Sequence, residues 1–397
     1  MFVLSLTALL MASCSRENRE TPSTWNPQAA ATYLDQREIS WMSWPGAARD
    51  HDTFCVSCHT VLPYVLSRPS LRPALAEREQ SENERKILDN VSKRVRLWNE
   101  IGPYYSGREY DNAKSSESRG TESVLNALIL SADDARVGEL RGTTRAALAN
   151  MWSLQLTDGG EKGSWPWLRF GMEPWEANDS VYYGAALAAL AMGTAPENYR
   201  TSTEIRANFK LLHDYLNSKY PSQSVLNHAT LLWASTKLPD LVDTDRKKAI
   251  IRELVASQQA DGGWGLPSLS WPADWTLRSI VRKRLRSDFT RQDSSSDGYA
   301  TGFITFVLQQ IGMQPEKDLP VKRGLKWLAT NQNPIDGSWP SVSLTQRRSE
   351  SSNVGHFMKD AATAYAVLAL TTGDQNQIKR SMETSFTDRK GKAGHGL

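Results

Sequence analysis

Residues 323–339, RGLKWLATNQNPIDGSW, contain the phrase that decides the fold. A helical segment reaches Gln332, a turn containing Gly337 follows, and Trp339 comes directly after the turn. The same order of Gln, glycine turn and Trp recurs in residues 254–264, LVASQQADGGW, and 151–165, MWSLQLTDGGEKGSW. Glycine ends a helix in a left-handed conformation, and the Gln amide can tie the turn to a neighbouring helix beneath the indole. Recurrence at intervals of tens of residues indicates a repeat architecture.

Two kinds of helical segment alternate along the chain. Amphipathic segments, charged on one side, are expected to form outer helices at 27–39, 84–100, 143–154, 203–216, 245–257 and 320–330. Segments rich in Ala, Gly and small polar residues are expected to form inner helices at 54–67, 122–131, 179–192, 224–236, 297–311 and 360–371. Small residues suit an inner ring because its helices crowd around one axis. The sequence predicts an all-α fold, an (α/α)6 toroid over residues 27–375, followed by a tail at 376–397.

The three phrases resemble the QW motifs of squalene-hopene and oxidosqualene cyclases, and the whole pattern resembles the toroid of terpene cyclases and protein prenyltransferases. The catalytic motifs of these enzymes are not matched. Class II cyclases use Asp-x-Asp-Asp, whereas this chain has QDSSSDG at 292–298 and a bare acidic pair at 133–134. Prenyltransferases hold zinc with Asp-x-Cys and His, whereas Tyr299 stands where the Cys should be. Neither cyclisation nor zinc-dependent transfer is expected, and no zinc is expected.

Cys55, Cys58 and His59 form a Cys-x-x-Cys-His motif, the spacing that attaches a c-type haem. The thiols would bond the vinyl groups of one haem c, and His59 would be the proximal iron ligand. A redox dithiol, an incomplete zinc site and coincidence are the alternatives. The motif is expected to open the first inner helix. Arg68 and Arg72, in a proline-rich exit from that helix, could pair with the haem propionates.

The N-termini of the inner helices are expected to meet at one mouth, because outer-then-inner winding makes these helices parallel. The acids expected there, as catalytic candidates or as helix caps, are Glu122, Asp179, Asp297 and Asp360. His356 or Met358 is the candidate distal iron ligand, and an open iron site is the alternative. Met172 and His228 are weaker candidates. The resemblance implies that the mouth holds the catalytic groups.

The N-terminus indicates export. Residues 1–13 are apolar, too short to span a membrane and suitable as a signal peptide. The sequence LMASC at 10–14 resembles a bacterial lipobox, which predicts acylation of Cys14, although no Lys or Arg precedes the apolar run. A plain secretory peptide is the alternative. The chain is therefore expected on the periplasmic side of a bacterial membrane, anchored in lipid through Cys14 with a tether at 14–26.

Charge and composition limit the function. The 397 residues carry a net charge of +3, and no basic helix or aromatic–basic ladder indicates nucleic-acid binding. The basic run at 278–291 is read as a solvated helix face, with an anionic-lipid contact as the alternative. The main hypothesis is a membrane-anchored c-type haem protein, either an electron carrier with a redox partner protein or an oxidoreductase acting on an apolar small molecule. The alternative is a non-redox toroid enzyme or binding protein, terpenoid cyclase-like or glycan-directed, in which the cysteines serve structure.

Overall fold

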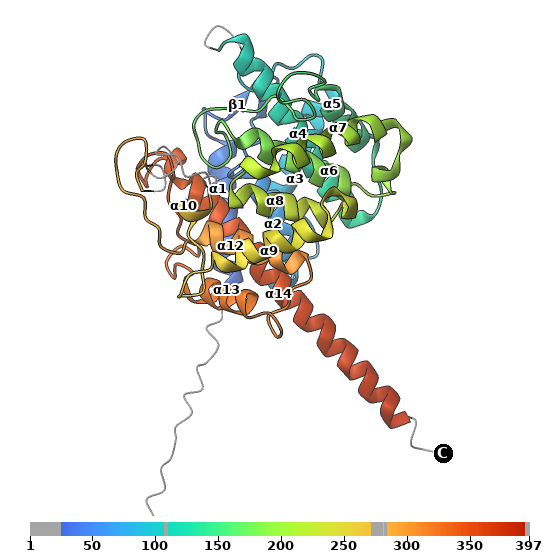
Figure 1. The fold of residues 1–397 in the computed structure, drawn as a ribbon, viewed down its shortest axis with the longest axis vertical. Coiled ribbons are helices and arrows are strands. Elements are labelled where there is room, and N and C mark those ends of the chain that lie inside the picture. Colours follow the sequence, from blue (N-terminus) through green and yellow to red (C-terminus); the bar gives the residue numbers. More distant parts are fainter. Residues whose placement is uncertain (1–24, 107–109, 271–280, 282–283, 394–397) are drawn as a thin grey trace, which may run out of the picture.

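Within the described residues, six outer and six inner helices alternate, as predicted. The structure, a computed structural model, describes residues 25–106, 110–270, 281 and 284–393, with side chains as far as residue 373. The outer helices are α1 (Pro27–Met42), α3 (Glu82–Arg96), α5 (Gly142–Ser153), α7 (Arg206–Lys219), α9 (Thr244–Ala256) and α13 (Leu319–Thr330). The inner helices are α2 (Val61–Leu75), α4 (Asn112–Val137), α6 (Ser180–Thr194), α8 (Val225–Ser235), α12 (Gly298–Gln310) and α14 (Asn353–Ala393). Figure 1 shows their arrangement.

The inner helices form a closed ring. Each packs against the next along the chain, and α14 packs against both α12 and α2. Small residues allow this approach: a Cβ added to Gly302 of α12 would lie only 2.5 Å from the backbone nitrogen of Ala366 in α14. Ala-rich α6 is buried from Ser180 to Met192. The predicted (α/α)6 toroid is thereby confirmed.

The Gln–Gly–Trp turns join neighbouring outer helices. Gln332 donates its amide to the carbonyls of Gly337 (2.9 Å) and Asn26 (3.0 Å), and the Trp339 indole donates to Leu328 (2.8 Å). The equivalent sets are Gln155, Gly163, Asn208, Trp165 and Met151, and Gln258, Gly262, Pro320, Trp264 and Leu254. Because Asn26 caps α1, the Gln332 bonds link α13 to α1 and close the outer ring.

Several local features differ from the sequence-based expectation. Helix α2 begins only at Val61, so Cys55–His59 lie in the turn before it. A short hairpin of β1 (Ala48–Arg49) and β2 (Thr53–Phe54) precedes that turn. The Ser57 hydroxyl accepts from the backbone N–H groups of Thr60 and Val61, which stabilises a turn ahead of α2, whose cap residue is Thr60.

The remaining elements are short. They are α10 (Leu266–Leu269) and the 3₁₀ turns Tyr199–Thr201, Thr203–Ile205, Tyr220–Ser222 and Pro239–Leu241. Helix α14 continues through residue 376, where the tail was expected to begin, and its last part projects from the rings in Figure 1. Within the described part of the chain, no helix combines the length and apolar character needed to cross a bilayer. Cys14 lies outside the described residues.

Candidate functional site

The Cys-x-x-Cys-His motif is buried where the first and last repeats of the ring meet. Cys55 is 4% exposed, Cys58 1% and His59 2%. Trp41 of α1 donates its indole N–H to the Cys55 carbonyl at 2.8 Å, and Cys55 donates its backbone N–H to Ala47 at 2.8 Å. The motif is therefore held by the outer helix before it and by the hairpin, and its side chains point into packed protein.

Aromatic rings enclose the His59 imidazole. Phe357 of α14 stacks on it with ring centroids 3.5 Å apart and an interplanar angle of 16°. Trp41 makes an edge contact at 5.2 Å, and Trp175 lies at 5.6 Å. Phe357 stands between His356 and Met358, the predicted distal ligands. The structure thus brings this segment of α14 to the motif but presents the phenyl ring, which cannot bind iron.

The hydrogen bonds of His59 fix its tautomer. Thr60 donates its only hydroxyl proton to Asp360 (2.9 Å), so the contact between His59 Nδ1 and Thr60 Oγ1 (3.0 Å) requires Nδ1 to carry the proton. Nε2 then keeps its lone pair, and among the described residues no hydrogen bond reaches it. Burial, and secondarily the positive charge of Arg37, lower the pKa of His59 to about 3. His59 is therefore a neutral imidazole with an unprotonated Nε2.

Asp360 organises this end of the ring. It accepts hydrogen bonds from Tyr33 (2.9 Å), from Arg37 (2.9 Å) and from Thr60. Burial raises its pKa, and the Arg37 guanidinium acts against that shift. Asp360 joins α14 to α1 and to the motif turn. Its partner Thr60 in that turn stands 300 residues earlier in the chain. It is a positioning residue for His59 and not a carboxylate facing open solvent.

The packing of the motif does not fit a haem. The donor set has the right chemistry, because a neutral imidazole and two adjacent thiols are present. A porphyrin bonded to both sulfurs would nevertheless need space beside side chains that are 4% and 1% exposed and are covered by protein. Haem attachment at Cys55 and Cys58 stays a prediction that would require the Phe357 and Trp175 rings to move.

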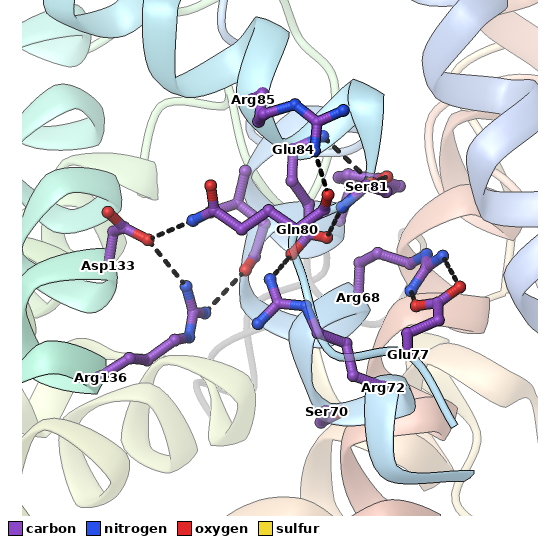
Figure 2. A network of polar contacts seen from close by, with 12 residues as sticks. Arg68, Ser70, Arg72, Glu77, Gln80, Ser81, Glu84, Arg85, Asp133 and Arg136 are labelled. Carbon is purple, nitrogen blue, oxygen red and sulfur yellow. Dashed lines mark hydrogen bonds and ion pairs between the residues drawn. The ribbon is translucent and has the colours of Figure 1, made fainter. Parts of the chain in front are cut away.

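The arginines considered for the propionates are already engaged. Arg68 forms ion pairs with Asp35 (3.0 Å) and Glu77 (2.7 Å), and Arg72 bonds Glu84. Figure 2 shows the pairs of Arg68 with Glu77 and of Arg72 with Glu84 at the end of α2. These ion pairs give the two arginines a structural role at the proline-containing end of α2.

The two thiols should be unreactive in the folded protein. Burial raises the pKa of Cys55 to about 12 and that of Cys58 well above its usual value, so thiolate is scarce at neutral pH. We expect the reaction with Ellman's reagent to proceed at less than about a tenth of its rate in denaturant. Release of two equivalents at full speed from native protein, lacking the signal segment with Cys14, would contradict this packing.

The other predicted acids have structural partners. Glu122 lies in the middle of α4, not at its start, and bonds Arg94 at 2.6 Å, with both side chains fully buried. Asp297 caps α12, accepts from the backbone of Tyr299, and also accepts from Leu266 at 2.6 Å. Burial raises the pKa of Asp297 to about 6. Asp179 is half-buried just before α6. Glu122 therefore does not stand at a helix start as predicted, and Asp297 is a helix cap, one of its two predicted roles.

Of the two weaker iron-ligand candidates, His228 has side-chain partners in another part of the ring, and Met172 makes a backbone contact. His228 bonds Glu253 at 2.8 Å and stacks on Tyr220, beside α8 and α9. Met172 forms an isolated backbone bridge with Glu176. Both ring nitrogens of His228 are engaged, by Glu253 and by the Tyr220 carbonyl, and Met358 itself is 4% exposed in the core.

Two buried carboxyl groups were not predicted. Glu38 of α1 is fully buried, and burial, reinforced by the negative charge of Asp360, raises its pKa to about 8. Glu176, beside the motif cysteines, has a pKa raised by burial to about 7. Neither oxygen of Glu38, nor Oε2 of Glu176, has a hydrogen-bond partner among the described residues. Both can hold a proton near neutral pH. The aromatic neighbour Trp175 could have indicated that Glu176 is buried. Glu38 stands among the charged residues of an outer helix, and nothing in the local sequence indicates its burial.

Glu38 should make the protein less stable as pH rises. Its pKa is 4.5 in the unfolded chain and about 8 when folded, so the folded state binds more protons between these values. The free energy of unfolding should fall across this window, by up to about 4 kcal/mol. Glu38→Gln should flatten the decline without loss at pH 5. Urea unfolding from pH 5 to 9, with the exposed Glu139→Gln as control, tests this; an unchanged slope in Glu38→Gln would contradict it.

A cavity opens next to the motif, on the other side of the start of α14. Its volume is about 460 Å³, and its walls come from residues 286–293, from 341–350 and from Gly355, His356 and Lys359 of α14. We call it the mouth cavity. His356, a predicted distal ligand, lines this cavity. Ser341, in the same wall, donates to the α12 cap Asp297 at 3.0 Å.

Comparison with solved structures agrees with the fold. A polysaccharide lyase matches with a TM-score of 0.50 and 14% identity, over 87% of this chain and 96% of that chain. A glycosyl hydrolase family 88 protein from Bacteroides vulgatus matches with a TM-score of 0.49 and 11% identity, over 87% and 97%. At these identities the likeness extends to the fold alone. No family model and no curated protein matches the sequence.

Proposed function

We propose that this chain is a non-redox α/α-toroid enzyme or binding protein directed at a glycan or a similar polar small molecule, in which Cys55 and Cys58 serve structure. The observation that carries the proposal is the burial of the whole motif: both thiols and the imidazole are at most 4% exposed. A redox centre that exchanges electrons with a partner or acts on a substrate needs an approach to its cofactor, and this packing offers none at the motif.

Two further observations support a polar ligand. The mouth cavity lies at the ends of inner helices, and its wall is formed mainly by polar side chains. One solved structure with a similar fold is titled a polysaccharide lyase, which makes a glycan a ligand class worth testing first. The Gln–Gly–Trp turns, on which the likeness to terpene cyclases rested, bind outer helices together and supply no chemistry. Anchoring in the bacterial envelope through acylated Cys14 remains part of the proposal.

The test is a pyridine haemochrome spectrum of the full chain made in a host with c-type haem maturation. We expect no haem band, and intact-mass analysis should find Cys55 and Cys58 unmodified. The same preparation should gain thermal stability with at least one member of a panel of neutral and acidic oligosaccharides, because a ligand that binds only the folded state stabilises it. Covalent haem in the spectrum would overturn the proposal.

A c-type haem protein is the second candidate, and one observation favours it. The tautomer of His59 leaves Nε2 unprotonated, and metal-bound histidines commonly donate the other ring N–H to a hydrogen-bond partner, as Nδ1 does here to Thr60. The haemochrome spectrum distinguishes the two candidates. A Phe357→Ala variant, which removes the ring stacked on His59, should then raise haem incorporation if packing alone restrains it.

A further inference from the structure

We propose that the mouth cavity binds a small molecule that carries oxyanion groups, that is carboxylate, sulfate or phosphate. This inference names the ligand class for the proposed non-redox function and rests on it. It depends on the charge, the hydrogen bonds and the shape of the cavity wall, none of which involves the Cys-x-x-Cys-His motif.

Positive charge is concentrated in the wall. Five cationic side chains line the cavity: Arg286, Arg291, Arg347, Arg348 and Lys359. Only two acidic residues, Asp293 and Glu350, line it. The surplus of three equals the net charge of the whole chain, in which 47 basic residues face 44 acidic ones. A concave site with one sign of charge focuses its field and attracts ligands of the opposite sign.

Some of the cationic side chains hold the wall together, and others are available to contact a ligand. Arg286 bonds the Ser343 carbonyl at 2.7 Å and so fixes the two loops that form the wall. Among the described residues, the guanidinium groups of Arg291 and Arg347 form no ion pair or hydrogen bond. Arginine presents a planar set of donors that matches the geometry of carboxylate and phosphate. These two arginines are therefore the expected anion contacts.

The wall also removes water from some of its charges. Arg348 is half-buried; burial lowers its pKa, and the negative charge of Asp288 acts against that shift. His356 is half-buried, and burial together with the positive charge of Arg37 lowers its pKa, so it is a neutral hydrogen-bonding group at pH 7. An oxyanion in the cavity would offset the positive charge of Arg348 and could also accept a hydrogen bond from the imidazole N–H.

The shape favours a soluble ligand over a lipid surface. The cavity volume of about 460 Å³ falls in the range of about 300–1,000 Å³ that small-molecule sites occupy. Lipid headgroups of a bilayer present a flat array, which a hollow of this kind contacts poorly. The cavity can accept a short acidic saccharide or a compact phosphorylated compound.

Isothermal titration calorimetry of the full chain at low salt tests the proposal with three probes: trigalacturonate, inorganic phosphate and the neutral trisaccharide maltotriose. We expect trigalacturonate or phosphate to bind, maltotriose to bind at least tenfold more weakly, and binding to weaken as salt is added. The double variant Arg291→Gln/Arg347→Gln should weaken anion binding at least tenfold. The control Arg206→Gln/Arg252→Gln, with the same change of net charge at exposed outer-helix positions, should change it less than threefold.

Three results would overturn the proposal. Equal losses in the two double variants would show a non-specific charge effect. Tight binding of maltotriose with no preference for the anions would remove the ligand class but leave the glycan-directed function standing. Sedimentation with phosphatidylglycerol vesicles, without binding of either soluble anion, would assign the charge to a membrane surface. Failure of the proposed function is a separate result, because covalent haem would appear in the haemochrome spectrum whatever the cavity binds.

Discussion

Replacing Trp339 by Ala is expected to lower the free energy of unfolding by about 3–5 kcal/mol. The indole is fully buried, and its N–H donates to Leu328 at 2.8 Å. Its Cβ packs against Gly298 at the start of α12, where an added methyl group would approach it to 2.5 Å. The substitution therefore empties a large volume between an outer and an inner helix, and the surrounding rings cannot collapse to fill it.

Urea unfolding followed by circular dichroism measures this loss, and two variants resolve its origin. Trp339→Phe keeps most of the apolar volume but removes the N–H donor, so it should lose about 1–2 kcal/mol. Trp98→Ala removes a half-buried indole that contacts Arg119 on the surface and should lose about 1 kcal/mol. Equal losses in Trp339→Ala and Trp98→Ala would refute the role assigned to the glutamine–tryptophan turn.

The Arg94→Met variant should be destabilised by a similar amount, about 3–5 kcal/mol. Arg94 is fully buried and bonds Glu122 at 2.6 Å, Thr53 at 2.7 Å and the Gly102 carbonyl at 2.9 Å. Its removal leaves the Glu122 carboxyl without its principal partner, in a site where burial already raises the pKa of that group. The loss should therefore be smaller at acid pH, where Glu122 takes up a proton.

A double-mutant cycle separates the pair from its surroundings. Arg94→Met/Glu122→Leu should be more stable than Arg94→Met alone, because no uncompensated charge remains in the core. Lys210→Met breaks an exposed ion pair with Asp214 on α7 and should leave the urea midpoint unchanged. If the double variant were as unstable as the sum of the two single variants, the pair would not be coupled as the structure implies.

Periodicity and composition were sufficient for the fold. The outer helices carry charge on one side and the inner helices are rich in Ala and Gly, and both patterns are local properties of the sequence. The start of α2 was placed too early. Ser57, inside the predicted helix, accepts from the Thr60 backbone N–H and holds a turn there, so that α2 begins only at Val61. The turn glycine of the 151–165 phrase is Gly163, at φ +97°, where a Cβ would lie 2.2 Å from the Leu211 carbonyl oxygen. No feature of the sequence distinguishes it from Gly159 and Gly160.

The candidate site depended on contacts between distant segments. His59 meets Phe357, and Thr60 meets Asp360, 300 residues further along the chain. Glu122 was read as a helix-start acid because the inner helix was predicted to begin there, whereas α4 begins at Asn112. Its partner Arg94 stands on another helix, and no local sequence pattern predicts that pairing. The motif was recognisable from six residues, but its burial was not, because the rings that cover it come from both ends of the chain.

The closure between Gln332 and Asn26 has a consequence for how the chain can fold. A linear array of repeats gains stability one unit at a time, and its first units can stand before the last are made. Here Asn26, the cap of α1, donates its backbone N–H to Gln332 and accepts from the Gln332 amide. Tyr33 and Arg37 of α1 donate to Asp360. During synthesis the first repeat therefore cannot complete its contacts until almost the entire chain has been made. Such long-range pairing slows folding and exposes the unpartnered inner helix meanwhile, so a late truncation should damage the beginning of the protein as much as its end.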